Sequence, residues 1–251
     1  MKAPYEACLS FTELAPLITM VRRALVTGSS SGIGLAVSRR LIDDGWCVDG
    51  LDQQPAVIQH DRFTQHSLDL SNPRDIAQLL RSALLTPPPS AMVHAAGLLS
   101  TGALGQLSTE AGDRMWAVHV RAASLLADGL IPAMQRSRWG RVILIGSRVS
   151  QGMAGRSQYA ATKAALVALA RSWAAETAAM GITVNVISPA ATDTPMLKDP
   201  ARNASPPRVP PMGRFIRPDE VASLAAYLIS DRADAITGQD ISICGGASVR
   251  A

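Results

Sequence analysis

The sequence predicts a single α/β domain in which helices cover both faces of a mainly parallel sheet, giving three layers. Short apolar segments alternate with longer segments of helical spacing, as in repeated βαβ units. The strand segments are nearly all apolar, as expected for strands buried on both faces. The length of 251 residues suits one such domain, and the proline-rich stretches 86–90 and 202–213 are interpreted as loops inside it.

The expected strands are short runs, several of them rich in β-branched residues, that end at glycine or polar residues. The first, "RRALVTG", ends at a glycine, and "GRVILIGS" is the most clearly β-branched. In chain order they cover residues 22–28, 46–52, 63–70, 91–97, 140–147, 181–188 and 239–246.

The expected helices lie between these strands. Ile33, Val37 and Leu41 recur at helical spacing in the first, and the second begins with a Ser or Asn cap followed by Pro73 in its first turn. In chain order they cover residues 32–44, 71–85, 108–136, 157–180 and 218–230.

Composition excludes several classes of protein. The net charge is +4, but the arginines are scattered, so we expect no nucleic-acid partner. The three cysteines, Cys8, Cys47 and Cys244, are far apart and lack metal-ligand spacing, which indicates reduced thiols in a cytoplasmic protein without a metal. No apolar run reaches about 18 residues, so we expect no membrane span.

The first twenty residues add no clear element. Glu13 and Pro16 interrupt what would be the apolar part of a signal peptide, and Met20 begins "MVRRALVTG", a natural start for the domain. We therefore expect residues 1–20 to be an N-terminal extension of unknown role and residues 21–251 to be the domain.

A glycine- and serine-rich turn, "TGSSSGIG" (27–34), follows the first strand and opens the first helix. Such a turn directs backbone N–H groups and a helix N-terminus at a phosphate, and its glycines allow the close approach of a pyrophosphate. Its spacing differs from G-x-G-x-x-G, and a turn without a ligand is the alternative. The residues expected to bind a cofactor here are Gly28, Ser30, Ser31, Ile33 and Gly34.

Asp52 ends the second expected strand, eighteen residues beyond Gly34. A carboxylate at this position accepts hydrogen bonds from an adenosine ribose and repels a 2′-phosphate. No arginine or lysine lies in the turn or just after Asp52, which favours NAD over NADP as the cofactor.

Tyr159 and Lys163 lie four residues apart on an expected helix, so their side chains share a face. A nearby ammonium stabilises a phenolate and lowers the phenol pKa, which suits the pair to exchange a proton with an alcohol. Ser147 ends a strand twelve residues earlier, where its hydroxyl could hold the substrate oxygen. These three residues are the candidate catalytic set.

From about Val21 onward the chain resembles the short-chain dehydrogenase/reductases. The matching stretches are "TGSSSGIG", "HAAG" (94–97), "GS" (146–147), "YAATK" (159–163), "SPAATDTPM" (188–196), 211–230 and 236–246. The resemblance implies a Rossmann-like, doubly wound, seven-stranded parallel sheet and a catalytic role for Ser147, Tyr159 and Lys163. It also implies cofactor contacts from Asp69, Leu70, Ala95, Ala96, Gly97, Tyr159, Lys163, Pro189, Thr192 and Thr194.

Three positions depart from the family pattern. His119 stands where the family usually has the asparagine of a proton relay, and it is either a relay residue in its own right or a packing residue. His94 replaces a structural asparagine. Ala190 replaces a glycine after Pro189, and its more restricted backbone predicts a different loop path.

The region of the family's substrate lid, 195–213, is short and proline-rich, which predicts a small substrate. Met153, Met196 and Leu197 are candidate apolar contacts. The stretches "HAAGLLSTGALGQLS" and "LDQ" look like those of dihydrodiol dehydrogenases of the dihydroxybenzoate type, so the alcohol could be a cyclic diol.

Three functions follow from these features. The first is an NAD-dependent interconversion of a small secondary alcohol and its ketone. The alternatives are an NADP-dependent ketone or 3-oxoacyl reductase and a non-enzymatic dinucleotide sensor. The alanine-rich helix at 157–180 predicts a homo-oligomer, with a tetramer as the expected form.

Overall fold

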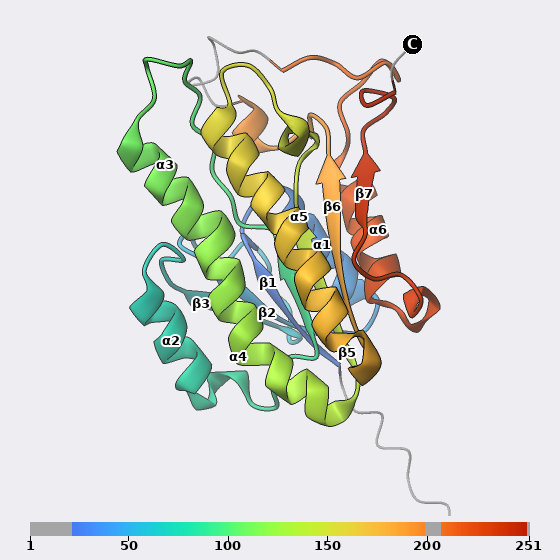
Figure 1. The fold of residues 1–251 in the computed structure, drawn as a ribbon. Coiled ribbons are helices and arrows are strands. Elements are labelled where there is room, and N and C mark those ends of the chain that lie inside the picture. The colour runs from blue at the N-terminus through green and yellow to red at the C-terminus, as the bar shows by residue number, and fades with distance from the viewer. Residues whose placement is uncertain (1–21, 199–206, 250–251) are drawn as a thin grey trace, which may run out of the picture.

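The computed structural model describes residues 22–198 and 207–249, and these form one seven-stranded parallel sheet (Figure 1). The strand order is β3-β2-β1-β4-β5-β6-β7. The strands are β1 Arg23–Thr27, β2 Cys47–Asp52, β3 Phe63–Ser67, β4 Ala91–His94, β5 Gly140–Ile145, β6 Ile182–Pro189 and β7 Asp240–Ile243. The predicted α/β fold, Rossmann-like and doubly wound, is confirmed.

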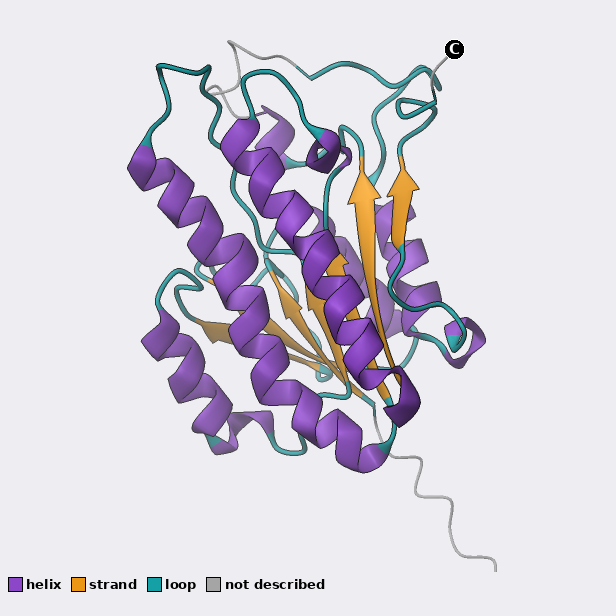
Figure 2. Ribbon diagram, viewed as in Figure 1, coloured by secondary structure: helices purple, strands orange, loops and turns teal. Residues whose placement is uncertain are grey.

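Helices cover both faces of this sheet, as the purple ribbons on either side of the orange strands show (Figure 2). Helices α2, α4 and α5 pack on one face, and α1 and α6 pack on the other. The helices are α1 Gly32–Asp43, α2 Pro73–Arg81, α3 Thr109–Trp116, α4 Ala122–Ser137, α5 Ser157–Thr177 and α6 Pro218–Ile229.

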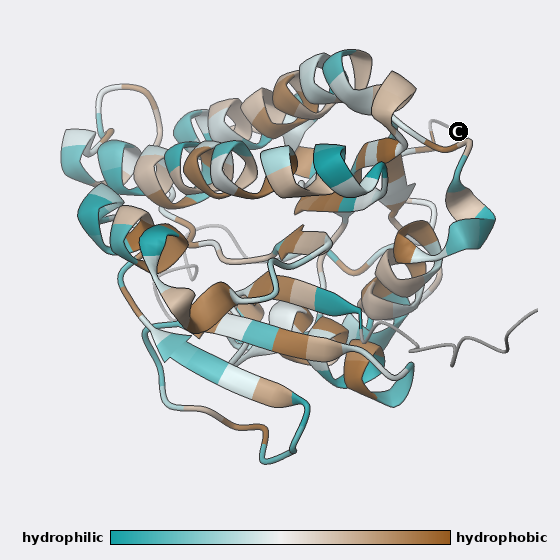
Figure 3. Cartoon of the chain, turned by 90° about the horizontal axis from the view of Figure 1, so that it is seen from below, coloured by the Kyte–Doolittle hydropathy of each residue, from teal (hydrophilic) through white to brown (hydrophobic). Residues whose placement is uncertain are grey.

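The side-chain alternation of each strand divides the core into two clusters. On β1, Leu25 belongs to the cluster with residues of α2, α4 and α5, whereas Ala24 and Val26 belong to the cluster with residues of α1 and α6. Figure 3, seen from below, shows brown strand segments between the two helical layers. Burial on both faces explains why the strand segments are nearly all apolar rather than alternating.

The chain reverses its direction of travel across the sheet at β1, which pairs with β2 on one side and β4 on the other. Thr27 is the last residue of β1 and lies opposite Leu51 and His94. In open parallel sheets, ligands bind outside the carboxyl ends of the strands at this switch point. The glycine turn that follows Thr27 is therefore placed at the expected crevice.

The segment predicted as one long helix, 108–136, is interrupted by a π turn over Ala117–Arg121 that joins α3 to α4. The wider turn carries His119, whose side chain is completely buried. Turns of this kind inside α-helices occur frequently at functional sites.

The expectation of an N-terminal extension at 1–20 falls outside the described residues, as does part of the lid segment, 199–206. Across the described ranges, no helix combines the length and hydropathy that crossing a bilayer requires. In the same ranges, no group of three or more His, Cys, Asp or Glu side chains is arranged to hold a metal ion.

Candidate active site

The turn between β1 and α1 depends on glycine at two positions. Gly28 has a φ of +71°, and a Cβ there would lie 3.0 Å from the backbone of Ala96. A Cβ on Gly34 would lie 2.2 Å from the carbonyl oxygen of Gly28. Only glycine permits this tight turn, which brings the N-terminus of α1 to the crevice.

Asp52 ties the end of β2 to this turn. One carboxylate oxygen accepts a hydrogen bond from the backbone N–H of Ser30 at 3.0 Å, and the other accepts from Gln54 N–H at 2.9 Å. The Ser30 hydroxyl donates toward the Gln54 carbonyl oxygen at 3.2 Å. The carboxylate is thus held rigidly at the mouth of the turn.

His94 supports the segment that follows β4. The Oγ1 atom of Thr27 accepts hydrogen bonds from Ala95 N–H at 3.0 Å and Ala96 N–H at 2.9 Å, so its own proton points to Nδ1 of His94, 3.0 Å away. The Nε2–H group of the ring then donates to the Val118 carbonyl oxygen at 3.0 Å. Burial, reinforced by the charge of Lys163, lowers the pKa of His94 to about 4. His94 therefore takes over a structural role as a neutral ring.

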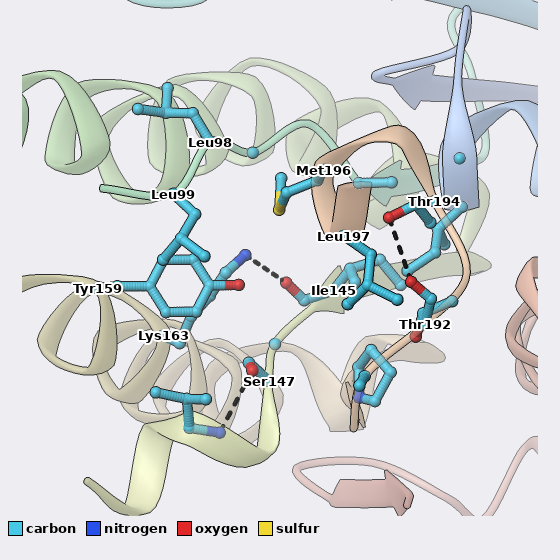
Figure 4. Close-up of a pocket in the computed structure, with 18 of the residues that line it drawn as sticks. Leu98, Leu99, Ile145, Ser147, Tyr159, Lys163, Thr192, Thr194, Met196 and Leu197 are labelled. Atoms are coloured by element: carbon cyan, nitrogen blue, oxygen red, sulfur yellow. Dashed lines mark hydrogen bonds between the residues drawn. The ribbon is translucent and has the colours of Figure 1, made fainter. Parts of the chain in front are cut away.

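Tyr159 and Lys163 project from α5 toward Ser147 at the end of β5 (Figure 4). The Lys163 Nζ atom lies 5.7 Å from the centroid of the Tyr159 ring and donates a hydrogen bond to the Ile145 carbonyl oxygen at 2.8 Å. Burial lowers the pKa of Lys163 to about 7. The Ser147 hydroxyl oxygen accepts from Val149 N–H at 3.2 Å, which leaves its proton to be donated elsewhere.

His119 lies behind this group with both ring nitrogens bonded. Its Nε2 atom accepts from Leu98 N–H at 3.0 Å, so the ring proton is on Nδ1, which donates to the Thr162 hydroxyl oxygen at 2.8 Å. The ring meets that of Tyr159 edge-on, with centroids 5.6 Å apart. Burial, together with the charge of Lys163, lowers the pKa of His119 well below its ordinary value.

The loop after β6 forms the far side of the site. The Thr192 hydroxyl donates to the Ala190 carbonyl oxygen at 3.0 Å, and the Thr194 hydroxyl donates to the Thr192 carbonyl oxygen at 3.3 Å. Ala190 N–H donates to the Ile243 carbonyl oxygen at 2.9 Å, which extends the β6–β7 ladder. The backbone at Ala190 is not in the left-handed region, so alanine fits this loop without strain.

These elements surround one cavity of about 1050 Å³. The residues proposed from the sequence that line it are Gly28, Ser31, Ile33, Asp52, Asp69, Leu70, Ala95, Ala96, Gly97, Ser147, Tyr159, Lys163, Pro189, Thr192 and Thr194. Three others, Ser30, Gly34 and His119, lie behind the lining and shape it. The expected apolar residues Met153, Met196 and Leu197 also face the cavity.

Sequence reasoning missed four arginines that line the same cavity, Arg114, Arg208 and the pair Arg148 and Arg156. The members of this pair lie close to candidate catalytic residues in the sequence. The first directly follows Ser147, and the second precedes Tyr159 by three residues. Their position inside the loop between two candidate catalytic residues was a signal in the sequence that could have identified them.

The cavity fits a dinucleotide. A side chain at Gly28 or Gly34 would collide with backbone atoms and close the turn, and the turn's amides and helix N-terminus suit a pyrophosphate. Asp52 and Asp69 lie at one end of the cavity lining, and the Ser147–Tyr159–Lys163 group lies at the other. A doubly wound sheet with this arrangement at its switch point defines a dinucleotide-dependent oxidoreductase.

Comparisons with known proteins agree. A family model described as enoyl-(acyl carrier protein) reductase matches residues 28–248. The 2,3-dihydro-2,3-dihydroxybenzoate dehydrogenase of Escherichia coli is 34% identical over 240 residues, covering 90% of this chain and 96% of the relative. A 3-oxoacyl-(acyl-carrier-protein) reductase of Rickettsia felis is 31% identical over 235 residues, with 90% and 96% covered.

The ligand-free aldohexose dehydrogenase of Thermoplasma acidophilum superposes with a TM-score of 0.83 at 28% identity, covering 92% of this chain and 95% of that one. The chain belongs to the short-chain dehydrogenase/reductase family. It is accordingly an NAD(P)-dependent oxidoreductase that acts on CH–OH groups.

Proposed function

We propose that the protein is an NAD-dependent dehydrogenase that interconverts a small secondary alcohol, with a cyclic diol as one candidate, and the corresponding ketone. The observation that carries this proposal is the convergence of Ser147, Tyr159 and Lys163 on one end of a cavity whose other end holds Asp52. When bound, the nicotinamide supplies or accepts the hydride.

The side chains of the chain itself perform the proton chemistry. Ser147 donates its free proton to the substrate oxygen and holds it beside Tyr159. Tyr159 takes the alcohol proton during oxidation and returns it during reduction. The neighbouring ammonium of Lys163 favours the phenolate, and the phenolate in turn favours the ammonium, which burial alone disfavours.

Asp52 supports NAD as the cofactor. Its carboxylate is fixed by the N–H groups of Ser30 and Gln54 at the position expected for the adenosine ribose. A 2′-phosphate there would meet a negative charge, and the next two residues, Gln53 and Gln54, offer no cation to offset it. Asp69 and Leu70 would flank the adenine, and Pro189, Thr192 and Thr194 would flank the nicotinamide.

His119 is proposed as a positioning residue rather than a proton relay. Both of its nitrogens are occupied by protein groups, and the hydrogen bond to Thr162 continues to the Tyr159 carbonyl oxygen at 2.8 Å. These linked hydrogen bonds fix the first turn of α5, from which Tyr159 projects. The packing alternative for His119 is therefore favoured over the relay.

Experiment can distinguish two other candidate functions from this proposal. Similarity to 3-oxoacyl reductases supports a ketone or 3-oxoacyl reductase as the second candidate, for which the sequence-based alternative is NADP as the cofactor. Titration with NADH and with NADPH distinguishes it, because tighter NADPH binding would replace our proposal by this one. Tight NADH binding without turnover of any alcohol would instead point to a dinucleotide sensor.

We further propose a homotetramer in the cytoplasm. Helix α5 is alanine-rich, so a second subunit could approach its outer face closely. Cys47 and Cys244 are free thiols, as suits a reducing compartment. Light scattering at micromolar concentration should give four times the chain mass, and a monomeric mass would refute the assembly.

A further inference from the structure

Arg148 and Arg156 place two guanidinium groups in the loop that connects the proposed catalytic residues. Arg148 opens the short helix Arg148–Gln151 directly after Ser147, and Arg156 occupies the N-cap position of α5 without a capping hydrogen bond from its side chain. Both line the cavity together with Tyr159. Arg156 is only 8% exposed, which is unusual for arginine.

Arg148 has no acidic partner in the described part of the chain. Its Nε atom is buried and has no hydrogen-bond partner, and none of the ion pairs among the described residues includes it. A buried guanidinium nitrogen without an acceptor is costly, so an acceptor is expected to arrive with a ligand.

The acidic residues that line the cavity are at its other end. Within the described lining they are Asp52, the last residue of β2, and Asp69, which follows β3. Asp52 is bonded to the glycine turn, and Asp69 accepts from Ser71 N–H at 2.8 Å. Burial alone would raise the pKa of Asp69, but hydrogen bonds from Ser71 and Gln53 and the charge of Arg114 lower it overall. Arg114 therefore lies near Asp69, whereas Arg148 and Arg156 flank Ser147 and Tyr159 in the sequence, and the described lining places no carboxylate beside Arg148.

We propose that the substrate carries a carboxylate, which Arg148 binds with Arg156 beside it while the substrate's alcohol lies at Ser147 and Tyr159. This inference rests on the proposed function and narrows it to secondary hydroxy acids, open-chain or cyclic. A guanidinium matches a carboxylate through two parallel N–H···O bonds, which lysine cannot reproduce. Binding one end of the substrate in this way also orients the carbon that bears the alcohol.

Apolar side chains complete the proposed subsite. Leu99 is drawn beside Tyr159 in Figure 4, and Leu98, Met153 and Met196 also line the cavity. Such neighbours exclude water, and an ion pair in water-poor surroundings is stronger than one in bulk solvent. They would also contact the carbon skeleton between the carboxylate and the alcohol.

The first test measures binding without turnover. Benzoate and benzamide are titrated calorimetrically into the NADH-saturated protein and into the Arg148→Met, Arg148→Lys and Arg39→Met variants. Arg39 is an exposed arginine on α1 that lies outside the cavity, so its variant is the matched control. An unchanged Kd for NADH shows that each variant retains the fold.

We expect wild type and Arg39→Met to bind benzoate more tightly than benzamide. In Arg148→Met, benzoate binding should weaken by roughly 30-fold or more, as when one partner of a buried ion pair is truncated. Arg148→Lys should recover only part of the loss, and benzamide binding should not change. Equal benzoate binding by wild type and Arg148→Met, or no benzoate binding by wild type, would overturn the inference.

The second test measures kcat/KM with NAD for 3-hydroxybutyrate and 3-hydroxycyclohexanecarboxylate and for their amides. A preference for the acids that Arg148→Met abolishes supports the subsite. Turnover of acids and amides with equal kcat/KM overturns the subsite and leaves the dehydrogenase standing. Arg148-dependent benzoate binding with no turnover of any alcohol supports the subsite and overturns the dehydrogenase.

Discussion

The Nδ1 atom of His119 lies 2.8 Å from the hydroxyl oxygen of Thr162, and the direction of this hydrogen bond fixes the tautomer of the ring. Because Leu98 N–H can only donate, Nε2 is the acceptor and Nδ1 carries the proton. The Thr162 hydroxyl in turn donates a hydrogen bond to the Tyr159 carbonyl oxygen. A residue at the position of the family's relay asparagine is thereby bonded to the backbone of the proposed catalytic tyrosine.

His119→Asn should leave the shape of the kcat–pH profile unchanged, because the histidine exchanges no proton during turnover. His119→Leu should lower the free energy of unfolding by roughly 1–3 kcal/mol, because the part-buried Leu98 N–H loses its acceptor. Urea unfolding and pH–rate profiles of both variants provide the measurements. Loss of one limb of the profile in a folded His119→Asn enzyme would show that the ring is a relay after all.

Asp52→Asn should relax the choice of cofactor. The amide retains an oxygen that can accept a backbone hydrogen bond but removes the negative charge opposed to a 2′-phosphate. We expect the ratio of the NADPH and NADH dissociation constants to fall by about tenfold or more, equivalent to roughly 1.4 kcal/mol. Fluorescence titration measures both constants.

Asp52→Ala is the companion variant. It should relax the same preference and also lower Tm, because Ser30 N–H and Gln54 N–H lose their acceptor. If NADPH binding stays as weak in both variants as in wild type, Asp52 does not select the cofactor.

His94 should make the protein less stable in acid. Its pKa is about 4 in the folded chain and near 6.5 in an unfolded one, so below pH 6.5 the unfolded state binds the extra proton. Stability attributable to the neutral ring is complete above pH 6.5 and is lost as the pH falls toward 4. A pKa difference of this size corresponds to a loss of roughly 3 kcal/mol in the free energy of unfolding.

His94→Asn removes this titration while an amide can still accept from Thr27 and donate to the Val118 carbonyl oxygen. Urea unfolding at pH 7 and pH 4.5 should show a smaller acid loss in His94→Asn than in wild type. His60→Asn, at an exposed histidine, serves as the control and should lose as much as wild type. An acid loss in His94→Asn equal to that of wild type would assign the effect to other groups.

The sequence was sufficient for the elements that burial determines. The run at 140–147 is apolar because both faces of β5 are covered, and the observed strand Gly140–Ile145 lies within it. The cap of α2 was predicted as Ser or Asn, and the structure identifies Asn72, whose side chain accepts from Arg74 N–H. Local chemistry determines such features, so a single sequence contains them.

Features that depend on contacts between distant segments could not be predicted. The π turn over Ala117–Arg121 has no local sequence signal. The tautomer of His119 depends on Leu98 and Thr162, which lie 21 and 43 residues away. The charge around Tyr159 is a third such feature. It depends on the fold, which places the carboxylates Asp52 and Asp69 at the opposite end of the cavity from Arg148 and Arg156.

The most direct test of the account compares wild type with Tyr159→Phe in the reduction of NAD, followed at 340 nm with a secondary hydroxy acid. Phenylalanine keeps the ring but removes the group that exchanges the proton. We predict that wild type reduces NAD and that the variant binds NADH with an unchanged Kd while its kcat falls by roughly 100-fold or more. Equal rates in the two proteins would contradict the central claim that Tyr159 is the acid/base of an NAD-dependent alcohol dehydrogenase.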